Sequence, residues 1–465
     1  MLTAFSQHNS KEECAVNNIR PAYETLNHYD YYPADLHIEY QQALEEGKDI
    51  AAYEALFQAV RQMPHGEHQN RMADVLYDLM MSLPQREDYA YEEPSDLEAI
   101  RACRPAASFQ PGKPDPDTMA DRIRGAWYGR VCGCLLGKTV EGIRTDELHP
   151  LLKESGNWPM HRYIRSTDPT EEMLNTFRYK LRERCYADTI PCAPTDDDTN
   201  YVVLAQLIVE KYGRDFTPEN VGQAWMDLQP REAYCTAERI AFNNLVGGFR
   251  PPHTAVWHNH YREWIGAQIR GDYFGYINPG QPELAAEMGW RDASISHIKN
   301  GIYGEMFIAA IIAAAAVEQD IEKLIRAGLE QIPAKCRLSE AVLHVLDEYQ
   351  SGVSEEECAA DIHRTWDEHS AHGWCHTISN AMIVVMALLY GNGDFGKSIC
   401  LSVQTGFDTD CNGATVGSIL GMRSGMSAIG EEWTAPLHGQ LDTSIFGVGR
   451  VQLEDMVQKT LSHVR

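Results

Sequence analysis

The stretch Arg122-Ile-Arg-Gly-Ala-Trp-Tyr-Gly-Arg-Val-Cys-Gly-Cys-Leu-Leu-Gly137 carries glycine at every fourth position, and the same stripe recurs at Gly413, Gly417 and Gly421. Residues four apart lie on one face of an α-helix. Each glycine in a helix interior costs about 0.8–1.0 kcal/mol relative to alanine, so several in register need a compensating contact. We therefore predict two helices whose glycine faces allow a neighbouring helix to approach closely at the centre of a domain.

Most of the remaining chain also has a helical pattern. Apolar residues recur at three- and four-residue spacing from Ala34 to about Leu83 and again in 119–136, 201–212, 304–318, 339–349, 379–390 and 412–422. Alternating strand patterns are scarce, which favours an all-α fold. The turn-rich segment Pro111–Asp117 resembles a linker, so we predict an N-terminal helical extension over 1–115 and a separate domain over 116–465.

The composition narrows the class of partner. The 465 residues include 40 basic and 67 acidic ones, and this net charge of −27 disfavours nucleic acid and anionic membranes as partners. The longest apolar stretch, Met306–Val317, is shorter than the ~20 residues of a membrane-spanning helix, and the N-terminus shows no secretion signal. Twelve scattered cysteines form no Cys-x-x-Cys motif and no compact disulfide framework. We expect a cytoplasmic protein with reduced cysteines.

Two groups of aspartates stand directly before predicted helices. Asp196, Asp197 and Asp198 precede the apolar helix that begins at Tyr201, and the segment from Asp408 to Asn412 precedes the second glycine stripe. An aspartate at a helix start caps free amides, and further acids in the first turn gain about 0.3–1 kcal/mol each from the helix dipole. Capping explains one or two of the acids in the first group, but not three adjacent ones.

Metal binding explains the aspartates that helix capping does not. Mg²⁺ and Mn²⁺ prefer oxygen ligands, and a pair of such ions needs about four or more protein oxygens. The two aspartate groups supply that number if they converge. An antiparallel arrangement of the helix over 119–136 would bring Glu141 to the same place. The sequence therefore predicts a centre for two divalent cations, Mg²⁺ or Mn²⁺.

From about Arg122 to the C-terminus the chain resembles the ADP-ribosylglycohydrolase family. The resemblance rests on the glycine-striped segment with Glu141, on Asp196-Asp197-Asp198-Thr199 in place of Thr-Asp-Asp-Thr, and on Gly406-Phe-Asp408-Thr-Asp410 in place of Gly-Gly-Asp-Thr-Asp. It implies a large orthogonal helical bundle with a binuclear metal site. It also implies hydrolysis of a ribosyl N- or O-glycosidic bond, in an ADP-ribosyl conjugate or a related riboside.

The resemblance also implies a role in the site for each matching residue. It implies metal ligands at Asp196, Asp197, Asp198, Asp408 and Asp410, and a mobile glutamate at Glu141. The ions would hold the ribose hydroxyls and a bridging water, with Asp197 as the group that takes the water's proton. Residues expected to contact substrate are His297, Arg270, Tyr303, Trp374, His376 and Asn412.

The chain departs from the family pattern at two places. Cys411 replaces a hydroxyl ligand, and its soft sulfur is a poor partner for Mg²⁺. The segment from Trp257 to Ile265 contains no glycine, although relatives that act on ADP-ribose carry a glycine-rich loop for the diphosphate there. Arg262 could contact a phosphate instead, and the aromatic and histidine content suits a smaller sugar or nucleoside equally well.

Two rival functions use the same residues. A metal-dependent phosphoesterase would need a similar pair of ions. A non-catalytic member of the fold would keep the helical body as a binding or structural protein. For the acidic helical extension, we expect packing on the catalytic body or a contact between subunits of a homo-oligomer.

Overall fold

The computed structural model describes Tyr23 and residues 26–464. The chain divides into two compact units, unit 1 up to Arg86 and unit 2 from Glu87 onward. The described residues of unit 1 form the α-helices α2 (Leu36–Glu45), α3 (Glu54–Arg61) and α4 (Glu67–Ser82). One face of α4 is buried through Ala73, Leu76, Tyr77 and Met80, as the spacing of its apolar residues predicts.

Unit 2 is also built from helices. Its α-helices are α5 (Leu97–Cys103), α6 (Pro116–Lys138), α7 (Thr145–Glu154), α8 (Glu171–Thr176), α9 (Asp197–Tyr212), α10 (Pro218–Leu228), α11 (Thr236–Val246), α12 (Asp272–Tyr276), α13 (Pro282–Ala293), α14 (Lys299–Ala315), α15 (Ile321–Leu329), α16 (Arg337–Gln350), α17 (Glu355–Thr365), α18 (Thr377–Gly391), α19 (Phe395–Gln404), α20 (Thr409–Ser424), α21 (Glu431–Thr434) and α22 (Leu453–His463). In the described part of the chain, the strands β1 (Gln440–Leu441) and β2 (Val451–Gln452) form one short antiparallel sheet. The predicted all-α fold is confirmed.

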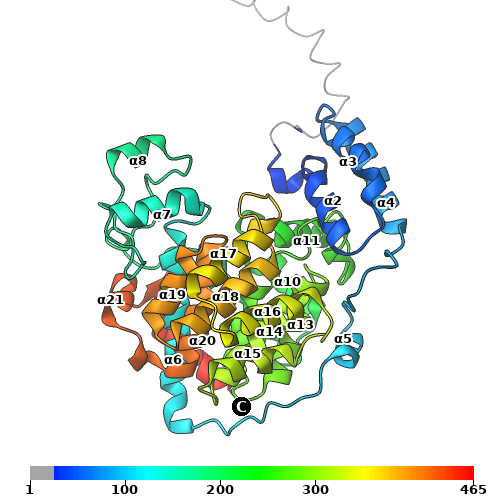
Figure 1. Cartoon of the computed structure of the whole chain (residues 1–465). Coiled ribbons are helices and arrows are strands. Elements are labelled where there is room, and N and C mark those ends of the chain that lie inside the picture. Colours follow the sequence, from blue (N-terminus) through cyan, green and yellow to red (C-terminus); the bar gives the residue numbers. More distant parts are fainter. Residues whose placement is uncertain (1–22, 24–25, 465) are drawn as a thin grey trace, which may run out of the picture. The chain divides into compact units, whose positions relative to one another are not determined.

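Two apolar helices form the centre of unit 2. Every residue of α14 from Asn300 to Ala315 is buried, and so is nearly all of α18. A helix that is apolar on every side needs neighbours on every side. Figure 1 shows α14, α16 and α18 in the middle of this unit, with α7 and α8 at one end. Within the described residues, no helix has both the length and the hydrophobicity needed to cross a membrane.

The glycine stripes pack against each other, as predicted. A Cβ atom added to Gly133 would lie 1.9 Å from the carbonyl oxygen of Gly413, and one added to Gly129 would lie 2.2 Å from that of Gly417. The pairing runs in opposite directions along α6 and α20, so the helices are antiparallel. The C-terminal end of α6 therefore lies beside the start of α20, where the second aspartate group stands.

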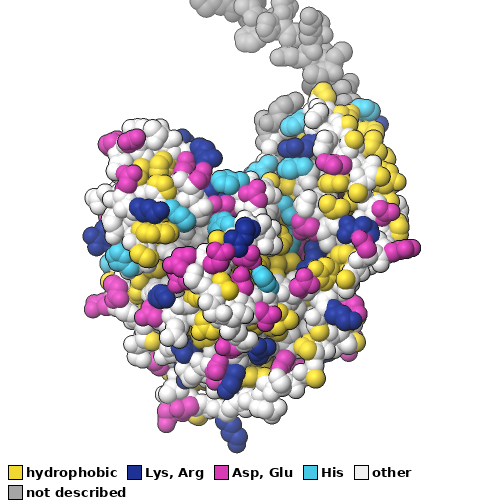
Figure 2. Space-filling model, in the orientation of Figure 1, with side chains coloured by type: hydrophobic (Ala, Val, Ile, Leu, Met, Phe, Trp, Pro, Cys, Tyr) yellow, Lys and Arg dark blue, Asp and Glu magenta, His cyan; other side chains and the backbone are white. Residues whose placement is uncertain are grey.

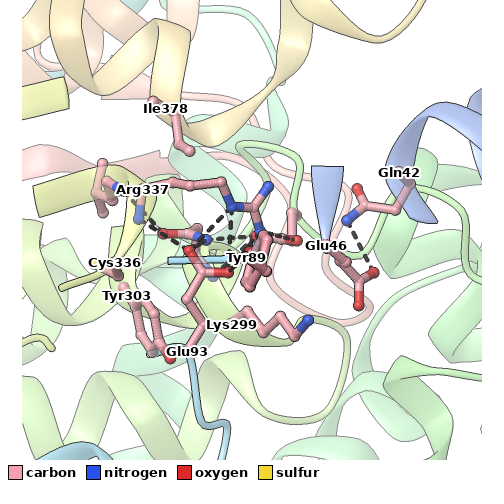
Figure 3. A network of polar contacts seen from close by, with 12 residues as sticks. Gln42, Glu46, Tyr89, Glu93, Lys299, Tyr303, Cys336, Arg337 and Ile378 are labelled. Carbon is pink, nitrogen blue, oxygen red and sulfur yellow. Dashed lines mark hydrogen bonds and ion pairs between the residues drawn. The ribbon is translucent and has the colours of Figure 1, made fainter. Parts of the chain in front are cut away.

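An extended segment before α5, residues 89–95, is bound to the helical body of unit 2. We call it the strap. Glu93 of the strap pairs with Arg337, which also pairs with Glu263, at 2.9 and 2.7 Å. Figure 3 shows the side chains of Arg337, Glu93 and Tyr303 gathered at this point. The hydroxyl of Tyr303 donates to the carbonyl oxygen of Pro94.

The charge of the outer surface is mixed. Figure 2 shows Asp and Glu side chains spread among Lys and Arg over the visible face. On that face the acidic excess of the sequence is therefore distributed, and the aspartates before α9 and α20 form a separate, largely buried set.

Candidate metal centre

The aspartates of the first group begin α9. Asp196 is the N-cap residue, and its Oδ1 accepts a hydrogen bond from the backbone N–H of Asp198 at 2.9 Å. The capping role thus accounts for one oxygen of Asp196. Asp408 holds the equivalent position before α20 but makes no side-chain capping bond.

The two groups meet in space. Carboxylate oxygens of Asp198 and Asp410 and the sulfur of Cys411 lie within 4.8 Å of one another, and we call these residues the inner cluster. Oxygens of Glu141, Asp196 and Asp410 also lie within 4.8 Å of one another and form the outer cluster. Asp410 belongs to both clusters, so the ends of α6, α9 and α20 converge on it.

The inner cluster has open oxygen ligands. Asp198 and Asp410 are 0% and 2% exposed, yet Oδ2 of Asp198 and Oδ1 of Asp410 have no hydrogen-bond partner. Leaving a buried polar atom without a partner costs about 1–3 kcal/mol. A cation between these oxygens would remove that cost, so the residues fit a divalent metal ion.

The electrostatics of the centre also favour a cation. Burial and neighbouring carboxylates raise the pKa values of Asp197, Asp198 and Asp410 well above the ordinary range. Burial, followed by the charge of Asp196, raises the pKa of Glu141 to about 7. A positive charge among these groups relieves the repulsion between them.

Lys138 lies inside this acidic centre. Its Nζ atom is 2.5 Å from Oδ2 of Asp196 and 3.7 Å from Oε2 of Glu141. Burial alone would raise the pKa of Asp196, but the charge and hydrogen bond of the Lys138 ammonium, together with the backbone N–H of Asp198, lower that pKa. Lys138 is not among the site residues predicted from the sequence. Its position one helical turn before Glu141 is the signal that could have identified it.

Arg130 is a second residue that the sequence analysis did not select. It lies on α6 and is fully buried. Its guanidinium donates to the backbone oxygen of Asp198 at 2.7 Å, to Oδ1 of Asp198 at 2.8 Å and to Oδ2 of Asp272 at 2.7 Å. The sequence signal that could have identified Arg130 is its charge within the glycine-striped helix. Arg130 therefore occupies Oδ1 of Asp198, while Oδ2 has no hydrogen-bond partner among the described residues.

Three of the predicted substrate residues lie beside the centre, and all three are bonded to Asn380: Trp374, His376 and Asn412. Oδ1 of Asn380 accepts from the backbone N–H of Asp408 at 3.2 Å and from Nδ2 of Asn412 at 2.8 Å. Nδ2 of the same residue donates to the carbonyl oxygens of Trp374 and His376. Asn380 therefore joins the start of α20 to the segment that carries these two aromatic residues.

The other three predicted substrate residues lie in buried surroundings. Arg270 pairs with Glu238 and Asp292 at 2.6 and 2.5 Å and lies 3.6 Å from Glu305. The imidazole of His297 is fully buried, and its Nδ1 is 2.8 Å from the hydroxyl of Ser296. Tyr303 contacts the strap, as described above. No hydrogen bond or ion pair of the described residues joins these three side chains to the two clusters, and their role in substrate binding stays a prediction.

Comparison with known proteins gives the family of this chain. No curated protein matches the chain. A solved structure described as an "ADP-ribosylglycohydrolase-related protein complex" is similar at 19% sequence identity and a TM-score of 0.47, covering 75% of this chain and 98% of that chain. The family model for ADP-ribosylglycohydrolase matches residues 115–464. The chain belongs to the ADP-ribosylglycohydrolase family.

Proposed function

We propose that this chain is a hydrolase that uses divalent cations, Mg²⁺ or Mn²⁺, to cleave a ribosyl N- or O-glycosidic bond. Membership of the ADP-ribosylglycohydrolase family supports glycohydrolase activity in general. The observation that carries the metal dependence is the pair of buried, unpartnered oxygens on Asp198 and Asp410.

The metal ligands in this proposal are Asp196, Asp197, Asp198, Asp408 and Asp410. When bound, a divalent cation polarises the ribose hydroxyls and lowers the pKa of a water molecule that attacks the anomeric carbon. The Arg130 guanidinium holds Asp198 in place through two hydrogen bonds and also donates a hydrogen bond to Asp272. Oδ1 of Asn380 accepts a hydrogen bond from the backbone N–H of Asp408 and so holds the start of α20 in place.

Asp197 is our candidate for the group that takes a proton from the attacking water. It is the first residue of α9 and is only partly buried, so solvent and substrate can reach it. Its pKa lies well above the ordinary range because of burial and the charges of Asp196 and Asp198. A raised pKa makes a carboxylate a stronger base. Glu141, which is 42% exposed, is the second candidate for proton transfer.

For the substrate, the structure favours a related riboside over a diphosphate-containing conjugate. Arg262, the residue that could have contacted a phosphate, is 3% exposed and donates to the carbonyl oxygen of Asn259 at 3.0 Å. The carbonyl oxygen of Trp374 accepts from Asn380, and the Arg144 guanidinium lies 4.9 Å from the centroid of the Trp374 ring. An aromatic face with a nearby cation suits the base or sugar of a nucleoside.

The test is a substrate panel given to Mn²⁺-loaded and Mg²⁺-loaded protein. The panel contains an ADP-ribosylated arginine peptide, nucleosides and p-nitrophenyl phosphate, with sugar and phosphate release measured separately. We expect sugar release that is lost with chelator and in Asp410→Asn but kept in Asp146→Asn, whose carboxylate is 49% exposed. Phosphate release without sugar release would make the protein a phosphoesterase. Metal binding without any turnover would favour a non-catalytic binding protein.

A further inference from the structure

We infer that Lys138 supplies one of the cations of this centre, so that the chain binds one divalent ion, at the inner cluster, instead of two. The inference rests on the metal dependence proposed above and revises the expected number of ions. It assigns the outer cluster to an ammonium group that belongs to the chain itself.

The first support is the position of Lys138 in the outer cluster. The cluster consists of Glu141, Asp196 and Asp410, whose oxygens lie within 4.8 Å of one another. The Lys138 ammonium is 2.5 Å from one of these carboxylates and 3.7 Å from a second. A divalent ion at the outer cluster would lie next to this ammonium in a largely buried setting, where repulsion between cations is strong.

The second support is that Lys138 cannot easily leave. It ends α6, and a Cβ atom on the preceding Gly137 would lie 2.2 Å from the backbone of Thr409, so the backbone here is packed against α20. The side chain of Lys138 is 20% exposed, and that of Asp196 is 1% exposed. Moving the ammonium into solvent would leave the buried Asp196 carboxylate without its partner, which is costly.

The third support is the contrast with the inner cluster. Among the described residues, the Arg130 guanidinium pairs with Oδ1 of Asp198. Oδ2 of Asp198 and Oδ1 of Asp410 are buried and have no hydrogen-bond partner among these residues. One cluster is therefore neutralised by the chain, and the other is open to an ion.

The experiment counts ions on the full-length chain. Chelator-treated protein is titrated with Mn²⁺ by calorimetry, bound Mn²⁺ is measured by elemental analysis after gel filtration, and electron paramagnetic resonance distinguishes an isolated Mn²⁺ from a spin-coupled pair. We expect one isolated ion in the wild type. Lys138→Met should bind two coupled ions because Asp196 and Glu141 are then free, whereas Lys138→Arg should still bind one. Lys153→Met, a change of an exposed lysine on α7, is the matched control and should bind one.

Two coupled ions in the wild type would overturn the inference and leave the proposed function intact. No bound ion in the wild type would overturn both. A single ion in Lys138→Met would also overturn the inference. If Lys138→Met does not fold, as judged by circular dichroism, Lys138→Gln replaces it, because glutamine keeps a hydrogen-bond donor without the charge and leaves Asp196 and Glu141 in place. This variant should bind two ions, and a single ion there would again contradict the inference.

Discussion

Cys411 places a sulfur atom in a cluster whose other members are carboxylates. Its thiol is buried within 4.8 Å of oxygens from Asp198 and Asp410, and burial raises its pKa well above the ordinary range. Sulfur is a soft ligand that Mg²⁺ avoids, while an alcohol oxygen suits it. We predict that Cys411→Ser raises the affinity for Mg²⁺ about tenfold relative to Mn²⁺, as measured by competitive calorimetry. Cys400→Ser, a buried change outside the clusters, should leave this ratio unchanged.

His258 provides a test at low pH. Burial, with a smaller effect of His260, lowers the pKa of His258 from 6.5 to about 4. Between these values the unfolded chain binds a proton that the folded chain does not, so stability is complete above pH 6.5 and falls toward pH 4. The loss amounts to about 3 kcal/mol at pH 4. His258 has a φ of 53°, a conformation that asparagine tolerates, so His258→Asn is a conservative replacement.

Urea unfolding at several pH values measures this effect. The difference in unfolding free energy between His258→Asn and the wild type should change between pH 7 and pH 4 in favour of the variant. Other buried groups, such as His297, titrate in both proteins and cancel in the comparison. Equal slopes for the two proteins would show that His258 titrates normally in the folded chain.

At the scale of helices, the contact between α6 and α20 tolerates little added side-chain volume. We predict that Gly133→Ala lowers the unfolding free energy by about 3 kcal/mol or more, because its Cβ would lie 1.9 Å from the carbonyl oxygen of Gly413. The gain in helix propensity, about 1 kcal/mol, is too small to offset the clash. Gly112→Ala, whose Cβ would lie 3.5 Å from the nearest atom, is the control. Thermal unfolding of both variants makes the comparison, and equal melting temperatures would contradict the packing argument.

The same helices show how far the sequence could be interpreted. Helix positions follow from local spacing, and the glycine stripes predicted which helices pack closely, since only a backbone contact compensates for so many glycines. The pairing of Lys138 with Asp196 depends on tertiary structure, because the two residues are 58 positions apart. The surroundings of Arg270 could not be predicted from the sequence either, because its carboxylate partners come from α11, α13 and α14.

At the scale of the whole molecule, two separate observations bear on the predicted domain boundary near residue 115. The compact units divide between Arg86 and Glu87, while the family match begins at residue 115. The strap lies between these points and belongs to unit 2. Besides Glu93, it offers the carbonyl oxygen of Ser95 to the indole of Trp290 at 2.9 Å and the backbone N–H of Glu92 to the carbonyl oxygen of Lys335 at 2.8 Å. The strap therefore makes hydrogen bonds to polar groups of the helical body.

Two truncations separate these boundaries. A chain that begins at Glu87 keeps the strap, and we expect it to unfold at the same temperature as unit 2 of the full-length protein. A chain that begins at Asp96 loses Glu93 and so removes one ion pair of Arg337, whose side chain is 11% exposed, while the pair with Glu263 stays. Breaking a buried ion pair from one side costs about 3–5 kcal/mol. Glu93→Gln in the full-length chain should reproduce most of that loss in calorimetry. Equal stability of the two truncated chains would mean that the strap contributes nothing, and the functional domain would then begin where the family match does.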